Sequence, residues 1–114
     1  MRRALRANID LMPKRAERLQ VLQEAWIGDA VLTLYARRRI LREDGGIDGA
    51  KAERMTSNQF LAALAEPSEA EARIGRVYEA EGLDAAFAWI ETHLMPLFER
   101  QEANRTNKGG HSTR

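Results

Sequence analysis

The sequence contains no cysteine, only two histidines and no apolar run long enough to span a bilayer. The absence of cysteine excludes disulfides, thiolate catalysis and cysteine-ligated zinc. His93 and His111 are too far apart in the sequence to form a histidine-pair metal motif. Because the N-terminus also lacks the apolar core of a signal peptide, the sequence predicts a cytoplasmic protein that does not enter a membrane.

Neither sign of charge is in excess, since 18 basic and 17 acidic residues leave a net charge of only +1. The charges are nevertheless unevenly distributed. Bases gather in the first eighteen residues, between Arg37 and Arg42, and after Asn104, whereas acids concentrate between Glu66 and Glu102. Basic ends of this kind could meet a polyanion. A mixed, solvated surface explains the same distribution, so charge alone does not decide between the two.

Alternating runs of β-branched residues between turn signals are missing, and the strong helix formers alanine, leucine, glutamate and arginine dominate instead. We therefore expect an all-α fold, a compact single-domain helical bundle over residues 1–103, followed by a flexible basic tail over 104–114. Helices are predicted from Pro13 to about Arg42, from Asp48 or Gly49 to Ala65, from Ser68 to about Glu81, and from Leu83 to about Glu102, with a kink at Pro96.

The first of these helices carries large apolar residues at helical spacing, which indicates an apolar face with Trp26 in the core or in a dimer interface. The members of this face are Leu19, Leu22, Trp26, Val31 or Ala30, Leu34 and Leu41.

Two stretches break the helical pattern by placing a glycine and an acid in apolar surroundings. Gly28 and Asp29 interrupt an apolar run, although a glycine inside a helix costs about 1 kcal/mol relative to alanine and a buried carboxylate needs a partner. Gly75 likewise follows an isoleucine, with Glu71 four residues before it on the same helical face. Glycines at both places would let two helices approach closely and bring the two acids together.

Each acid also has an explanation without any catalytic role, and the sequence leaves these explanations open. Asp29 either pairs with a nearby arginine, faces water or binds a metal. Ser68 and Glu71 have the spacing of a capping box, with Ser68 as the N-cap and Glu71 as the third residue of the helix. Taken alone, this spacing therefore favours a capping role for Glu71.

Taken together and in this order, the two stretches resemble the catalytic domain of the ribonuclease III family. The stretch Trp26–Leu32 reads Trp-Ile-Gly-Asp-Ala-Val-Leu and is similar to the signature helix of that family. The similarity covers most of residues 18–98, and in size and motif the chain resembles the mini ribonuclease III branch, in a divergent and shortened form. The further stretches that carry the resemblance are Thr56–Asn58, Leu61–Leu64, Glu71–Tyr78, Glu81–Ala86 and His93–Leu94.

The resemblance implies a homodimeric endoribonuclease that hydrolyses phosphodiester bonds of double-stranded or structured RNA with Mg²⁺ or Mn²⁺. It identifies Asp29 and Glu71 as the catalytic, metal-binding carboxylates, because hard divalent cations prefer oxygen ligands and activate water. Protein contacts to double-stranded RNA are directed mostly at its shape and backbone. The candidates for such contacts are Arg37, Arg38, Arg39 and Arg42.

Two acids of the larger family members are replaced here. Ala25 stands where a glutamate would precede Asp29 by one turn, as is also typical of the active mini branch, and Ser68 stands where an aspartate would precede Glu71. The segment between the motifs is shorter as well. Two alternatives therefore remain: a catalytically degenerate member that binds RNA, a ribosome or another protein as a dimer, and an unrelated helical interaction domain.

Overall fold

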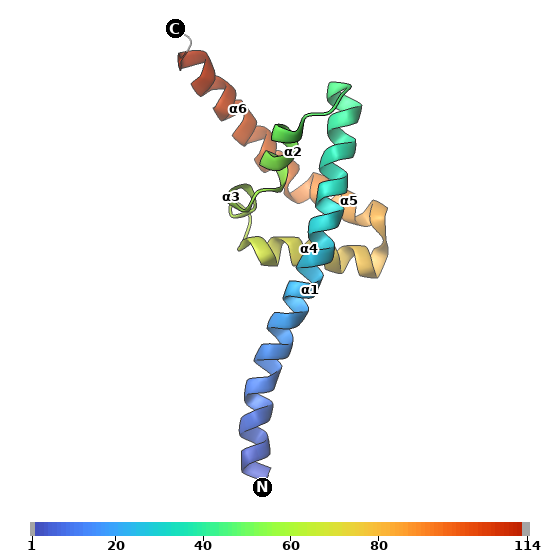
Figure 1. Cartoon of the computed structure of the whole chain (residues 1–114), viewed down its shortest axis with the longest axis vertical. Coiled ribbons are helices and arrows are strands. Elements are labelled where there is room, and N and C mark those ends of the chain that lie inside the picture. The colour runs from blue at the N-terminus through green and yellow to red at the C-terminus, as the bar shows by residue number, and fades with distance from the viewer. Residues whose placement is uncertain (1, 113–114) are drawn as a thin grey trace.

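The computed structural model describes the backbone of residues 2–112 and the side chains of residues 14–106. Every regular element in the described chain is a helix, which confirms the all-α prediction (Figure 1). None of the described helices is both long enough and apolar enough to cross a membrane. The helices are α1 (Arg2–Asp44), α2 (Gly49–Thr56), α3 (Asn58–Leu61), α4 (Pro67–Glu81), α5 (Leu83–His93) and α6 (Met95–Ser112).

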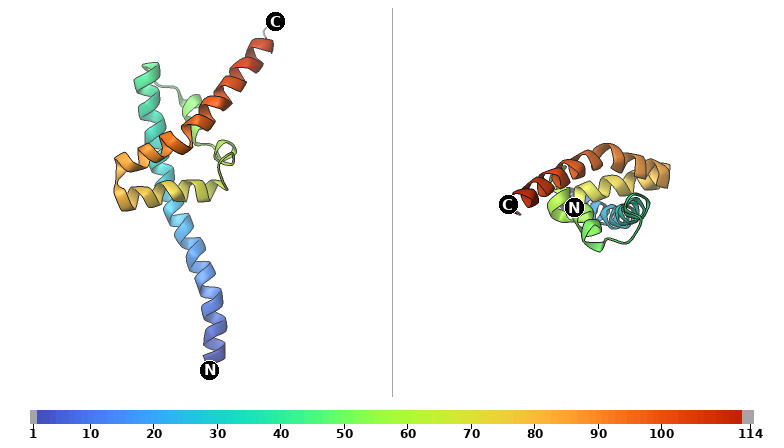
Figure 2. Two further views of the ribbon diagram at one scale, coloured as in Figure 1. Left: turned by 180° about the vertical axis from the view of Figure 1, so that it is seen from behind. Right: turned by 90° about the horizontal axis from the view of Figure 1, so that it is seen from above.

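A compact body surrounds the C-terminal half of α1, and the N-terminal half of the same helix projects away from it (Figures 1 and 2). Helix α4 crosses α1 in the middle of the body, and α5 returns alongside α4. The projection makes the molecule 72 Å long, with a radius of gyration of 18.3 Å. A compact domain with the same number of residues would have a radius of gyration of about 13 Å.

Three helix ends have local causes. Gly45 ends α1 with φ of 75°, and Gly82 separates α4 from α5 with φ of 97°, a region that favours glycine. Between α5 and α6, the chain bends at Leu94. This break places Pro96 in the first turn of α6, where its missing N–H is tolerated.

Three other boundaries differ from the prediction. Helix α1 begins at Arg2 and runs through Pro13, and the helix expected to reach Ala65 is divided at Ser57. There the Ser57 hydroxyl accepts a hydrogen bond from the Phe60 N–H (3.1 Å) and so caps α3. Residues 104–112, expected as a flexible tail, continue α6, while 113 and 114 lie outside the described residues.

The core lies between the C-terminal half of α1 and the helices packed around it. From α1 it contains Leu32, Tyr35 and Ile40. The other helices contribute Met55, Phe60, Leu61, Ile74, Ile90, Leu94 and Phe98, each at most 3% exposed. The core therefore contains side chains from all six helices.

The apolar face of α1 lies outside this core. Of the two places predicted for Trp26, the core is therefore wrong. Trp26 is 78% exposed, and the four leucines of that face are between 41% and 58% exposed, whereas Val31 is buried. Tyr78 of α4 is also at the surface, with 37% of its area exposed. The reason is that α4 packs against a face of α1 built from small residues, which leaves the large side chains on the opposite side.

Reciprocal glycine contacts define the crossing of α1 and α4. A Cβ atom on Gly28 would overlap the backbone carbonyl of Glu71, and one on Gly75 would overlap the backbone carbonyl of Glu24. In each helix, the glycine and the carbonyl-bearing residue are four positions apart and therefore lie on one face. Buried alanines beside both glycines, Ala25 among them, complete the contact. The two backbones consequently meet without intervening side chains.

We predict that Gly28→Ala destabilises the fold by at least the upper end of the range of about 1–3 kcal/mol seen for overpacked cores, because its Cβ would meet rigid backbone. Gly49→Ala is the matched control, since a Cβ there has no neighbour within 4 Å. Urea denaturation of both variants measures the difference. Equal stability of the two variants would contradict the close crossing.

Candidate acidic site at the helix crossing

The close crossing brings Asp29 of α1 next to Glu71 of α4. Asp29 directly follows Gly28, and the backbone carbonyl of Glu71 is the group that faces that glycine. The Asp29 side chain is exposed, whereas Glu71 is partly buried. Their carboxyl groups are within hydrogen-bonding reach of each other. The two acids singled out in the sequence therefore form one pair, as the spacing of the glycines predicted.

The electrostatics of this pair favour a proton on Glu71. Burial, a hydrogen bond to Asp29 and the negative charges of Asp29 and Glu66 raise the pKa of Glu71 from its ordinary value of 4.5 to about 8. Each of these causes opposes the ionised form, because a carboxylate loses hydration on burial and is repelled by neighbouring anions. At neutral pH the pair accordingly holds a proton that a bound cation would replace.

The explanation of Glu71 as a helix cap is wrong. The N-cap of α4 is Glu66, whose carboxylate accepts a hydrogen bond from the Glu69 N–H (3.0 Å). Pro67 is the first residue of the helix, a position that suits its fixed φ and its missing N–H. Ser68 therefore lies inside the helix, and Glu71 is the fifth residue of α4, about one turn in from its N-terminal end. Its position at the crossing has no role in capping.

The proposed salt bridge of Asp29 with an arginine is not found either. Within the described side chains, residues 14–106, no ion pair includes Asp29. The arginine at the crossing, Arg76, instead binds Glu24 (3.0 Å) and Glu69 (2.6 Å). This network joins α1 to α4 and was not predicted, because it links residues more than fifty positions apart in the sequence.

One of the four arginines proposed to contact RNA, Arg39, is engaged within the fold. Arg39 binds Glu43 (3.1 Å) and Glu99 (3.0 Å), and its side chain is only 13% exposed. Arg38 lies over the Phe87 ring at 5.9 Å. Arg37 and Arg42 are exposed. Arg39 thus connects α1 to α6, which leaves three of the four in positions that a polyanion can reach.

The donor set at the crossing consists of two carboxyl groups. Among the described residues, no group of three or more histidines or acids is arranged to hold a metal ion. Two carboxylates nevertheless suit Mg²⁺, which usually keeps several waters and binds through one or two carboxylates together with substrate phosphates. Asp29 and Glu71 are therefore compatible with a hard divalent cation, whose charge would offset the repulsion within the pair.

The chain matches no protein-family model, no curated protein and no solved structure. The functional argument consequently depends on the geometry of the site and on the sequence pattern.

We predict that native protein loses stability as the pH rises from about 4.5 to about 8. The unfolded chain releases the Glu71 proton near pH 4.5, whereas the folded protein keeps it until about pH 8, so folding binds a proton between these values. The free energy of unfolding should fall across this window and then level off. In Glu71→Gln, this part of the fall should be absent.

Urea denaturation at a series of pH values measures the effect. Glu79→Gln, on an exposed position of the same helix, is the control and should keep the native profile. A Glu71→Gln profile that runs parallel to the native one would show that Glu71 does not titrate in this window.

Proposed function

We propose that this protein is a metal-dependent endoribonuclease that hydrolyses phosphodiester bonds of double-stranded or structured RNA as a homodimer. The observation that carries the proposal is the contact between Asp29 and Glu71 across a helix crossing that admits no side chain between the backbones. These are the two acids that the resemblance to ribonuclease III assigns to metal binding. A purely structural role would not require two like charges to meet at a tightly packed crossing.

Asp29 and Glu71 would together hold the cation, Mg²⁺ or Mn²⁺. The bound ion would supply Lewis-acid chemistry, activating water and stabilising negative charge on the phosphate. The chain's own contribution is to position the two carboxylates, since Gly28 and Gly75 set the separation of the helices that bear them. Arg76 contributes indirectly, because its contacts to Glu24 and Glu69 fix α4 on α1.

Two basic side chains near this crossing support the proposed contact with a nucleic-acid backbone. Lys14, Glu17 and Arg18 of α1 line a groove whose other wall carries Glu69 of α4 and its N-cap Glu66. Glu66 is also one of the acids whose charge acts on Glu71. The groove therefore lies between the projecting part of α1 and an acid whose charge acts on Glu71. Lysine and arginine in such positions bind phosphates without reading the base sequence.

The proposed activity predicts cleavage of long double-stranded RNA by purified protein with Mg²⁺ or Mn²⁺, and none with EDTA. Asp29→Asn should lower the cleavage rate by at least about 100-fold, since even outer-shell partners of a metal contribute 10- to 100-fold. Asp84→Asn, an exposed acid at the start of α5, should cleave at the native rate. Circular dichroism establishes that each variant is folded.

The absence of cleavage by folded native protein with both metals would contradict the nuclease. The function would then be that of a catalytically degenerate module that binds RNA, a ribosome or another protein. Cleavage that persists in Asp29→Asn would place the catalytic site elsewhere.

A further inference from the structure

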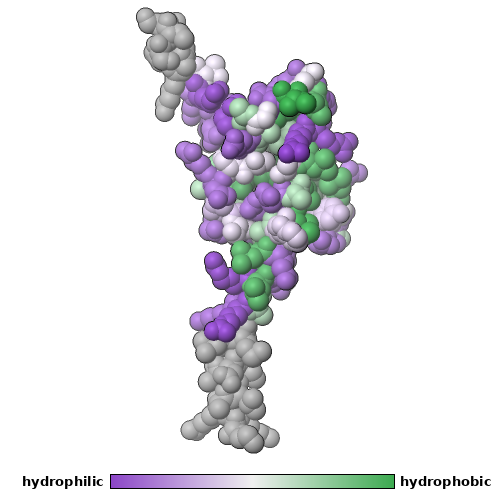
Figure 3. Space-filling view, viewed as in Figure 1, coloured by the Kyte–Doolittle hydropathy of each residue, from purple (hydrophilic) through white to green (hydrophobic). Residues whose placement is uncertain are grey.

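A groove of about 600 Å³ opens between the C-terminal half of α1 and α2, in the part of the body where Figure 3 shows apolar surface near the end of α1. Neither Asp29 nor Glu71 lines it. Its volume is within the range of about 300–1,000 Å³ that is typical of small-molecule sites. Ten residues line the groove, whereas a standard protein interface takes about 20–30 residues from each partner. Its size therefore suits a small molecule rather than the surface of another protein.

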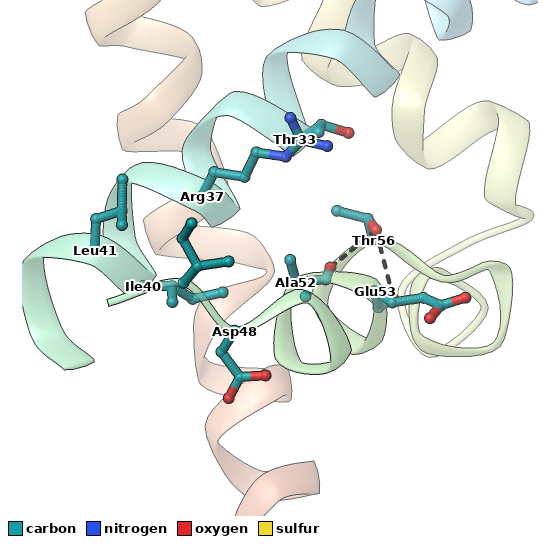
Figure 4. Close-up of a pocket in the computed structure, with 10 residues that line it drawn as sticks. Thr33, Arg37, Ile40, Leu41, Asp48, Ala52, Glu53 and Thr56 are labelled. Carbon is teal, nitrogen blue, oxygen red and sulfur yellow. Dashed lines mark hydrogen bonds between the residues drawn. The ribbon is translucent and has the colours of Figure 1, made fainter. Parts of the chain in front are cut away.

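The end of the groove nearest the loop between α1 and α2 is apolar. Ile40 and Leu41 of α1 line it together with Ala52 of α2 and Ile47 of the loop (Figure 4). Ile47 is 94% exposed and Leu41 is 52% exposed, so both side chains leave apolar surface in water. An apolar ligand lying in the groove would cover this surface, and removing apolar area from water is favourable. This end therefore suits a hydrocarbon.

The other end of the groove is polar. Thr33 and Arg37 of α1 line it together with Thr56 of α2 (Figure 4). Thr33 and Arg37 are four residues apart and share a face of the helix, and the Arg37 side chain extends toward Thr33. Unlike Arg39, Arg37 is in none of the ion pairs among the described side chains. Its guanidinium is therefore available to an anion at this end.

The two acids that line the groove do not extend into it. Asp48 is the N-cap of α2, where its carboxylate accepts a hydrogen bond from the Lys51 N–H (3.0 Å). The side chains of Asp48 and Glu53 both point away from the centre of the groove (Figure 4). Arg37 is thus the one charged side chain that extends along the groove, and a single guanidinium matches a single negative charge. Its planar fork binds a carboxylate through two parallel hydrogen bonds.

We propose that this groove binds a small amphiphilic monocarboxylate, such as a medium-chain fatty acid. The carboxylate would bind Arg37 beside the Thr33 hydroxyl, and the alkyl chain would extend along α1 toward Leu41 and Ile47. Thr33 and Leu41 are separated by about 12 Å along the helix, at 1.5 Å per residue, which is room for a chain of medium length. The inference goes beyond the proposed nuclease and is tested without RNA or metal, so that its failure would leave the nuclease untouched.

Titration of isotope-labelled protein with octanoate, followed by the NMR spectrum of the backbone amides, shows where the ligand binds. Saturable shifts should cluster at residues 33–41 and 47–56, which line the groove, with a dissociation constant at or below about 1 mM. Hexanoate should bind about 10-fold more weakly, because it buries two fewer methylene groups. Shifts confined to the exposed face around Trp26, or no saturable shift up to about 10 mM octanoate, would overturn the inference.

Arg37→Gln should weaken octanoate binding at least about 10-fold, because the carboxylate loses its charged hydrogen-bond donor. Arg42→Gln, an exposed arginine of the same helix outside the groove, is the control and should bind as the native protein does. Ile47→Ser should weaken binding at least about threefold, since less apolar surface is covered. Leu34→Ser, a change of an exposed leucine outside the groove, should have no effect. Native affinity in Arg37→Gln would overturn the assignment of the carboxylate.

Two further ligands distinguish a free amphiphilic carboxylate from other occupants of the groove. Octylammonium has a similar chain and the opposite charge, and it should bind at least about 10-fold more weakly than octanoate because its charge repels Arg37. Equal binding of the two would show that the chain alone drives association and would overturn the inference. The peptide acetyl-Ala-Leu-Leu-Leu ends in a free carboxylate. Tighter binding of this peptide than of octanoate would assign the groove to the C-terminus of a protein and would also overturn the inference.

Discussion

The crossing of α1 and α4 is the contact on which the candidate site depends. Gly28 and Gly75 each face a backbone carbonyl of the other helix, so no side chain separates the two backbones there. This contact determines which side of α1 is buried, and it leaves Leu19, Leu22 and Trp26 on the exposed side. It also brings the side chains of Asp29 and Glu71 together. The position of the site and the open apolar face are therefore two consequences of one packing constraint.

The acidic pair makes this crossing electrostatically unfavourable once both groups are ionised. Burial and the nearby carboxylates raise the pKa of Glu71 to about 8, which means that the protein holds a proton there at neutral pH. Natural proteins often keep such unfavourable arrangements at functional sites and compensate for them elsewhere. Here Arg76 binds Glu24 and Glu69 and keeps α4 on α1 without neutralising the pair. A divalent cation would supply the missing positive charge.

Much of the fold could be predicted because its signals are local. Gly45 and Gly82 end helices through their positive φ, and the two interrupted apolar runs predicted that Asp29 and Glu71 meet. Other features depend on distant partners and could not be predicted. The buried side of α1 is decided by where α4 crosses it, and Arg39 points inward because Glu99, sixty residues away, binds it. The cap of α4 was misassigned because Pro67 moves the helix start forward, so that Glu66 caps it.

The most direct test of a cation site at the crossing is calorimetric titration of the protein with Mn²⁺ at pH 7, in buffers that differ in their ionisation enthalpy. Because Glu71 is protonated at this pH and must ionise to bind a metal, each bound cation should release about one proton. Glu71→Gln should abolish both the binding and the proton release. Tight Mn²⁺ binding without proton release, or binding unchanged in Glu71→Gln, would contradict the assignment of Asp29 and Glu71 as the metal site.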